Sequence, residues 1–417
     1  MPFRTALSGL NASSAELRTI GNNVANATTV GFKKSRAEFA DIYAAANLGA
    51  GSNTIGSGVK VSDISQQFSQ GNIGFTDNNL DLAISGQGFF RLSDNGTNVY
   101  TRNGTFSVDR SGFIVNSQNN HLTGFLADNV GNITGALGDI QLDTSDIAPQ
   151  ATSTIGYGLN LNASETTTPA ILGPFDVNDA STYSDSTSLT IYDTLGDSHL
   201  TTTYYRKTAN PNEWEVYTFV DGTQLNGAQA NGSDLLGFNS IGDLSAINGA
   251  VAPPSTYTMG STFTPTNGSS PITLTIDYSA LSQYGGGFNV NALTQDGFST
   301  GRLSGINIAD TGVVLAQFTN GQTRTLAQVA LANFSNTQGL QEQGDVSWAE
   351  TFESGPALVG APGSSSLGLV QSGALEGSNV DLTEQLVNMI TAQRNFQANA
   401  QVISSADTVT QAIINIR

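Results

Sequence analysis

Two heptads of apolar residues, one at each end of the chain, constrain the fold more than any other feature. The first set is Phe3, Leu10, Leu17 and Val24, and the second is Leu382, Met389, Phe396 and Ile403. A seven-residue apolar repeat keeps one stripe of a helix facing a partner, because it corresponds to 3.5 residues per turn. The repeats predict a helix at each terminus, and we expect the two helices to pair and bring the chain ends together.

Composition limits the classes of partner and site. The chain has 417 residues, which favours two to four domains, and a net charge of −19 with only 12% charged residues. An acidic chain lacks the basic face that nucleic acid requires, and no polybasic patch suits an anionic membrane. The absence of cysteine excludes disulfides and thiolate metal sites. We therefore expect no nucleic acid, no membrane insertion and no cofactor.

We expect neither a cleaved signal peptide nor a membrane-spanning helix. The segment Met1 to Ile20 contains no apolar run long enough for the core of a cleaved signal peptide. No apolar stretch reaches the roughly 18 residues that a membrane-spanning helix needs. If the protein leaves the cell, we expect a route that reads an uncleaved N-terminus.

Boundary signals place the helices. Pro2 suits a first helical turn, and the N-terminal helix should end near Asn26 or Ala27. The pattern of residues 36–46 favours a short helix. Asp381, followed three positions later by Glu384, forms a capping-box pattern that marks the start of the last helix.

The 46 glycines, together with abundant Asn, Ser and Thr, predict β structure with tight turns between the helices. Strand patterns occur at 80–84, 88–92, 188–192, 200–205, 213–219 and 274–278. Asn103-Gly104 and Asn320-Gly321 are hairpin signals, because both residue types tolerate positive φ.

The order of these segments predicts a nested, multidomain α+β fold. Residues 1–74 with 355–417 should form a terminal helical domain, an α-helical coiled-coil pair with its connector. Residues 75–145 with 286–354 should form an inner, mainly β domain, and 146–285 an acidic outer β domain inserted at its tip. We expect an elongated subunit with the termini at one end.

No pattern supports catalysis or metal binding. His121 and His199 have no second metal ligand at zinc spacing, so each is interpreted as an exposed or core-edge histidine. Gly297 to Gly301 fits G-x-S-x-G, but no histidine follows Ser299, as that class of hydrolase requires. Asp176, Asn178 and Asp179 lack the glycine and terminal glutamate of a calcium loop, which favours a side-chain-capped turn. We expect no enzyme activity.

The last helix has an unusual surface. At about 1.5 Å per residue, its roughly 35 residues would span about 50 Å, which is long for an ordinary domain. Its polar face is nearly uncharged, with Gln393, Asn395, Gln397, Asn399 and Gln401 among its members. Such a face suits a crowded interface or an aqueous channel wall, although packing on its own domain remains an alternative from the pattern alone.

Several sequence runs resemble the rod and hook proteins of the bacterial flagellar axis. Gly21 to Lys33 (GNNVANATTVGFK) is similar to the N-terminal signature of that family, and Glu376 to Leu382 with Met389 to Asn399 is similar to the C-terminal one. The segments that resemble its inner β domain are Gly86 to Phe90, Tyr100 to Phe106, Gln295 to Phe298, Gly301 to Leu303, Ala332 to Asn336 and Gly339-Leu340. Phe396 stands where the family is expected to have tyrosine.

The resemblance implies a structural subunit that polymerises into a curved, flexible helical tube around an export channel and couples the rotary motor to the filament. The insertion of about 140 residues favours a hook subunit over the alternative, a distal rod protein. A secreted β-rich hydrolase or sugar-binding module is the remote alternative.

The resemblance also implies partners: copies of the same chain, the hook cap protein during assembly, the distal rod protein, the hook–filament junction protein and the flagellar type III export apparatus. The implied location is extracellular, in the flagellum. We expect the apolar terminal residues to carry assembly, namely Phe3, Leu7, Leu10, Leu17, Ile20, Val24, Leu382, Leu386, Met389, Phe396 and Ile403.

Overall fold

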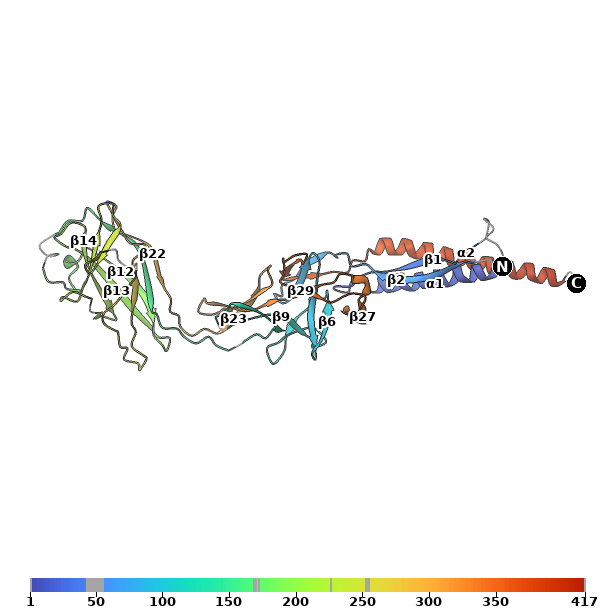
Figure 1. Ribbon diagram of the computed structural model, residues 1–417, viewed down its shortest axis with the longest axis horizontal. Helices are drawn as coiled ribbons and strands as arrows, with labels where there is room; N and C mark the ends of the chain where they lie inside the picture. Colours follow the sequence, from blue (N-terminus) through green and yellow to red (C-terminus); the bar gives the residue numbers. More distant parts are fainter. Residues whose placement is uncertain are drawn as a thin grey trace. The chain divides into compact units, whose positions relative to one another are not determined.

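The computed structural model is mainly β, with one helix at each end of the chain and more than one β domain (Figure 1). It describes residues 2–42, 56–128, 130–143, 145–167, 171, 173–225, 227–251 and 256–415. Contacts divide the chain into two compact units. Unit 1 comprises Met1–Thr144, Ser304–Gln317 and Thr323–Arg417, and unit 2 comprises Ser145–Leu303 and Phe318–Gln322.

Both terminal helices are present. Helix α1 spans Pro2–Ala25, which agrees with the predicted end to within two residues. Helix α2 spans Leu382–Asn415, and the Asp381 carboxylate caps it by accepting hydrogen bonds from the Thr383 and Glu384 amides. The Glu384 side chain, however, accepts from Lys34 at 3.1 Å, on the N-terminal segment. Neither described helix combines the length and apolarity that a bilayer crossing requires.

The predicted short helix at 36–46 is wrong over the residues that the structure describes. Strand β1 (Ser35–Asp41) pairs antiparallel with β2 (Val59–Gln66), and residues 43–46 lie outside the described ranges. The Ala37-Glu38-Phe39-Ala40 run has local helix propensity, but pairing with β2 and packing on α1 override it. The terminal helices therefore have a β-hairpin beside them (Figure 1).

A large sheet forms the body of unit 1. Its main path runs β23-β24-β25-β9-β5-β6-β28-β27, and shorter strands extend it to thirteen within the described residues. The strands are β5 (Phe89–Asp94), β6 (Thr97–Thr101), β7 (Ser107–Val108), β8 (Ile114–Val115), β9 (His121–Ala127), β10 (Ile133–Asp139), β23 (Leu303–Ile308), β24 (Val313–Phe318), β25 (Thr323–Val329), β26 (Leu331–Asn333), β27 (Gln341–Gly344), β28 (Ser347–Ala349) and β29 (Leu358–Gly360).

The two hairpin signals have different outcomes. Asn320-Gly321 lies between β24 and β25, which pair antiparallel as predicted. Asn103-Gly104 does not join a hairpin, because β6 pairs with β5 and β28, whereas β7 pairs with β8. A Cβ atom on Gly104 would collide with the Leu82 carbonyl, so this glycine permits close backbone approach. The β5–β6 hairpin turns instead at Asn95-Gly96, both with positive φ.

Two small antiparallel pairs connect the sequence-distant parts of unit 1. Strand β3 (Ile73–Phe75) pairs with β31 (Ala374–Glu376), and β4 (Leu82–Ser85) pairs with β30 (Leu369–Ser372). Each pair joins the N-terminal connector to the segment that precedes α2. The core beneath the sheet is apolar and includes fully buried Leu82, Phe90, Leu92, Leu122 and Val329.

Unit 2 contains two sheets around its own apolar core, which includes fully buried Ile155, Leu159, Trp214 and Leu236. The five-stranded sheet has β11 (Thr154–Asn162), β19 (Thr256–Thr258), β20 (Thr275–Asp277), β21 (Ser282–Tyr284) and β22 (Asn289–Gln295). The seven-stranded sheet has β12 (Asp185–Tyr192), β13 (Ser198–Lys207), β14 (Glu213–Val220), β15 (Thr223–Leu225), β16 (Asp234–Phe238), β17 (Leu244–Ile247) and β18 (Ala250–Val251). These counts refer to the described residues.

Candidate assembly interface

A buried charged cluster joins the two terminal segments to the sheet of unit 1. Glu376, the last residue of β31, accepts a hydrogen bond from Lys33 Nζ at 2.7 Å and from Arg102 Nη1 at 2.9 Å. The side chains of Lys33 and Glu376 are 0% exposed and that of Arg102 is 5% exposed. We call Lys33, Arg102 and Glu376 the junction triad.

Backbone groups also form hydrogen bonds with the junction triad. The Gly71 amide donates to Glu376 Oε1 at 2.8 Å, while Lys33 donates to the Ser69 carbonyl and Arg102 to the Gly86 carbonyl. Burial lowers the pKa of Lys33 and of Arg102, and the adjacent Glu376 carboxylate opposes both shifts. Because removing one partner would leave a buried charge unpaired, the triad fixes the connectors of α1 and α2 on the sheet.

Helices α1 and α2 lie side by side and antiparallel (Figure 1). Near the end of α1, Asn23 Nδ2 donates to Gln385 Oε1 at 3.1 Å. About four turns earlier in α1, Gly9 lies so close to Asn399 that a Cβ atom on Gly9 would collide with it. Both contacts fit one register, which places Pro2 opposite Ala406. The part of α2 from Asp407 to Asn415 therefore extends past the first residue of α1 (Figure 1).

Ala400 is partly covered, and the other less exposed positions of α2 alternate in steps of four and three residues. They are Gln385, Met389, Ala392, Phe396, Asn399, Ile403 and Ala406. This spacing is that of the a and d positions of a heptad, so these residues define the face of α2 that turns toward α1. We call this set the α2 seam.

Helix α1 is packed on two sides, against α2 and against the β1–β2 hairpin. On the hairpin side, Ser8 Oγ accepts from the Val59 amide at 3.2 Å, and Asn23 exchanges two hydrogen bonds with the Ser35 backbone. Its buried positions are mostly small residues, namely Ala6, Ala12, Ser13, Ala15 and Thr19, with Ile20 and Asn23. Small side chains allow this close approach on both sides.

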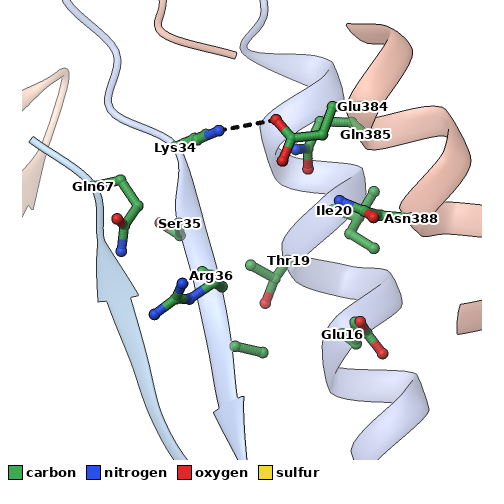
Figure 2. A pocket seen from close by; sticks show the side chains of 11 residues that line it. Glu16, Thr19, Ile20, Lys34, Ser35, Arg36, Gln67, Glu384, Gln385 and Asn388 are labelled. Carbon is green, nitrogen blue, oxygen red and sulfur yellow. Dashed lines mark hydrogen bonds and ion pairs between the residues drawn. The ribbon is translucent and has the colours of Figure 1, made fainter. Parts of the chain in front are cut away.

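A polar cavity of about 200 Å³ lies where α1, β1 and the start of α2 meet (Figure 2). Glu16, Thr19 and Ile20 line it from α1, Lys34 and Arg36 from the β1 side, and Glu384 and Asn388 from α2. Burial raises the pKa of Glu16. The Lys34–Glu384 ion pair spans part of the opening, with side chains 26% and 53% exposed. Because side chains of both charges and several amides line the cavity, it has no preference for one class of ligand.

The structure separates the predicted interface residues into two groups. Leu10, Leu17, Val24, Met389, Phe396 and Ile403 are half-buried, and Ile20 is buried. In contrast, Phe3 is 51% exposed, Leu7 42%, Leu382 48% and Leu386 51%. The first group is partly covered within the chain, whereas the second leaves apolar surface uncovered on both helices.

Helix α2 also exposes apolar side chains that were not among the predicted interface residues. They are Val387, Ile390, Val402 and Val409, each at least 45% exposed. The polar residues predicted to line the last helix are also exposed, except for Asn399, which lies in the α2 seam. A weakly charged helix with apolar residues on more than one face is suited to burial among several neighbours.

The remaining candidate sites are structural. Asp176 and Asp179 accept hydrogen bonds from the Asn178 and Ser181 amides, as expected of capped turns. The G-x-S-x-G segment leads into strand β23 and not into the helix of a nucleophile elbow. Both histidines are half-buried, and within the described residues no cluster of three or more His, Asp or Glu is placed to hold a metal.

The junction triad was missed by the sequence reasoning, although all three residues lie in the quoted signature runs. Lys33 ends the N-terminal run, Glu376 begins the C-terminal run, and Arg102 lies between Tyr100 and Phe106. Charged residues are usually solvated, so composition alone gives no reason to pair them. The signal available was that each of the three lies inside a run that resembles a signature of the family.

Comparisons with known proteins cover most of the chain. Four family models match: "Flagella basal body rod protein" at 3–33, "Flagellar hook protein FlgE/F/G D1 domain" at 83–156, "Flagellar basal body protein FlaE D2 domain" at 160–298 and "Flagellar basal body rod FlgEFG protein C-terminal" at 371–416. The rod descriptions therefore apply to the two ends of the chain.

Full-length relatives match as well. The chain is 39% identical over 428 residues to the flagellar hook protein FlgE of Escherichia coli (strain K12), covering 100% of both chains. It is 30% identical over 444 residues to that of Borreliella burgdorferi, covering 99% of this chain and 98% of the relative. The crystal structure of Helicobacter pylori flagellar hook protein FlgE2 has the same fold, with a TM-score of 0.55 and 16% identity, covering 73% of this chain and 100% of the other.

Proposed function

The chain belongs to the family of the flagellar hook protein FlgE and is a structural subunit of the flagellar hook, and from this premise we propose that its paired terminal helices carry polymerisation. One observation supports this above all: Phe3, Leu7, Leu382 and Leu386 remain about half exposed on helices that already pair with each other. Uncovered apolar surface of this kind marks a contact with another molecule. In a homopolymer, that molecule is another copy.

We further propose that α1 and α2 form a coiled-coil pair. The four-and-three spacing of the α2 seam and the antiparallel register with α1 support this reading. Leu10, Leu17, Ile20, Val24, Met389, Phe396 and Ile403 would hold the pair together within one subunit. Phe3, Leu7, Leu382 and Leu386 would contact neighbouring subunits.

The proposed assembly is a curved, flexible tube that couples the motor and rod to the filament and encloses the export channel. The terminal domain (1–74 with 355–417) would form the inner wall. The inner β domain (75–145 with 286–354) and the outer β domain (146–285) would form the layers outside it. The weakly charged polar surface of α2 suits both contact with neighbours and the lining of an aqueous channel.

Partners and location follow from this role. We propose export through the flagellar type III apparatus without a cleaved signal peptide, assembly beneath the hook cap protein, and contacts with the distal rod protein and the hook–filament junction protein. The location would be outside the cell, in the flagellum. The role is structural, so it requires no catalytic residue, cofactor or nucleic acid.

Electron microscopy of the purified chain under polymerising conditions tests the proposal. We expect the wild type to form tubes, and Phe396→Asp to abolish them while leaving the β structure folded, because a carboxylate in the α2 seam separates the helices. Leu386→Asp should also block tubes but preserve the helical content of the monomer, since Leu386 faces outward. Leu386→Met, which keeps an apolar side chain, is the matched control. Tubes of normal length from both aspartate variants would refute the proposal.

A further inference from the structure

A second cavity in unit 1, of about 280 Å³, lies beside the junction triad. Its walls include the rings of Phe68, Phe89 and Phe334, of which Phe89 and Phe334 are 2% and 5% exposed. The polar residues that line it are Gln87, Asn333, Ser335 and Thr337, and its single charged residue is Arg102. The cavity thus combines aromatic walls with one cationic group and no acidic one.

Among the residues that the structure describes, the charge next to this cavity is not balanced. The junction triad contains two cations, Lys33 and Arg102, and one carboxylate, Glu376, all nearly inaccessible to solvent. Carbonyl oxygens of Ser69 and Gly86 accept from the cations, but Arg102 Nε has no hydrogen-bond partner among the described residues. An excess positive charge in a poorly solvated site attracts an anion more strongly than a surface charge does.

The guanidinium of Arg102 is held in place on several sides. It donates to Glu376 and to Gly86, and its Cζ atom lies 5.5 Å from the centre of the Phe89 ring. The glycines at 86 and 88, both with positive φ, shape the turn that carries Gln87 along the cavity. The site is therefore built from ordered groups before any partner arrives.

We infer that this cavity receives an aspartate or glutamate side chain from a second copy of the chain in the assembled hook. This inference rests on the proposed function, because it needs copies of the chain in contact. The chain carries 34 acidic and 15 basic residues, so a neighbour presents many carboxylates and few competing cations. A neighbour held in a polymer also has a high effective concentration, which a free anion lacks.

Supplying the carboxylate from within the same chain tests the inference. Ser335 is exposed and lines the cavity, and its side chain makes no hydrogen bond with any residue that the structure describes. Ser335→Glu should occupy the cavity with an internal carboxylate and raise the critical concentration for tube formation at least tenfold. Ser335→Gln, which has the same shape without charge, should raise the critical concentration less than Ser335→Glu does, because it obstructs the cavity without neutralising it. Ser111→Glu, which adds a charge at an exposed position outside the cavity lining, should assemble within about twofold of wild type.

The monomer provides a second measurement. The melting temperature of Ser335→Glu should equal or exceed that of Ser335→Gln, because the new carboxylate balances the junction triad. Equal critical concentrations for the Glu and Gln variants, or a lower melting temperature for the Glu variant, would overturn the inference. If all variants form tubes as wild type does, the cavity inference fails and the hook role stands. If the wild type forms no tubes, both fail.

Discussion

Asn23 and Gln385, 362 positions apart in the sequence, form a buried hydrogen bond of 3.1 Å between the two terminal helices. Asn23 also donates to the Ser35 carbonyl at 2.8 Å and accepts from the Ser35 amide at 2.9 Å. One side chain therefore connects α1, α2 and the first strand of the hairpin.

Asn23→Ala should lower the free energy of unfolding of unit 1 by about 1–3 kcal/mol, because it leaves the Ser35 backbone groups and Gln385 without partners. Chemical denaturation followed by circular dichroism measures the change. Asn22→Ala, one residue away and exposed, is the control and should shift stability by less than about 0.5 kcal/mol. Equal losses in the two variants would contradict this role for Asn23.

Glu376→Gln should destabilise the chain by about 3–5 kcal/mol, since it leaves two buried cations without a counter-ion. Glu384→Gln removes the partner of Lys34 in an ion pair that is partly exposed, and should cost less than about 1 kcal/mol. Urea unfolding of both variants gives the comparison. A small effect of Glu376→Gln would mean that the buried cations are solvated by the surrounding carbonyl groups alone.

The helices were predictable because their signals are local. The heptads, Pro2 and the Asp381 cap each act within a few residues, and the bounds of α1 and α2 agree with them. The buried face of α1 was not predictable from the same heptad, since packing on two sides selects small residues such as Ala12 and Ala15. Strand β1 was missed because its partner, β2, begins 18 positions after β1 ends.

The junction triad shows a second limit of sequence reasoning. Lys33 and Glu376 are 343 positions apart, and their contact depends on strand pairing between β3 and β31. Charge counts treat such residues as surface groups. Only the three-dimensional pairing reveals that they are buried.

Stability of unit 2 should depend on pH through His199. Burial opposes its charge, but hydrogen bonds from the ring to Asp221 (2.7 Å) and Asp193 (3.4 Å) outweigh it and raise the pKa of His199. The Phe263 ring packs against the imidazole at 5.1 Å and adds no charge. The folded pKa therefore lies above the unfolded value of about 6.5.

The stabilisation from His199 should be fully present below about pH 6.5 and lost as pH rises through the folded pKa. We expect the free energy of unfolding of wild-type unit 2 to fall over this range, and His199→Gln to remove that slope. Burial, with Glu165, raises the pKa of Asp185 to about 6, so the difference between the two proteins isolates the histidine. Parallel pH profiles would contradict the prediction.

The two chain segments that enter and leave unit 2 are adjacent. Ile147 donates to the Gly301 carbonyl at 2.8 Å, and Gly301 donates back at 3.3 Å. Asp146 and Arg302 lie beside this bridge, with an N–O distance of 3.8 Å. A two-residue turn can join antiparallel strands at this spacing.

Replacing residues 148–300 by Asn-Gly should therefore remove most of unit 2 without straining the remaining chain. We expect the shortened protein to form tubes, because the terminal helices and the junction triad are intact, but with altered curvature or stiffness. Electron microscopy of the tubes measures curvature directly. The isolated segment 145–303 serves as the control: it has its own apolar core and should fold, yet form no tubes, because it lacks both helices. Loss of all assembly by the shortened chain would show that unit 2 carries essential contacts between copies. Tubes of unchanged curvature and stiffness would show that unit 2 has no part in setting the shape of the hook.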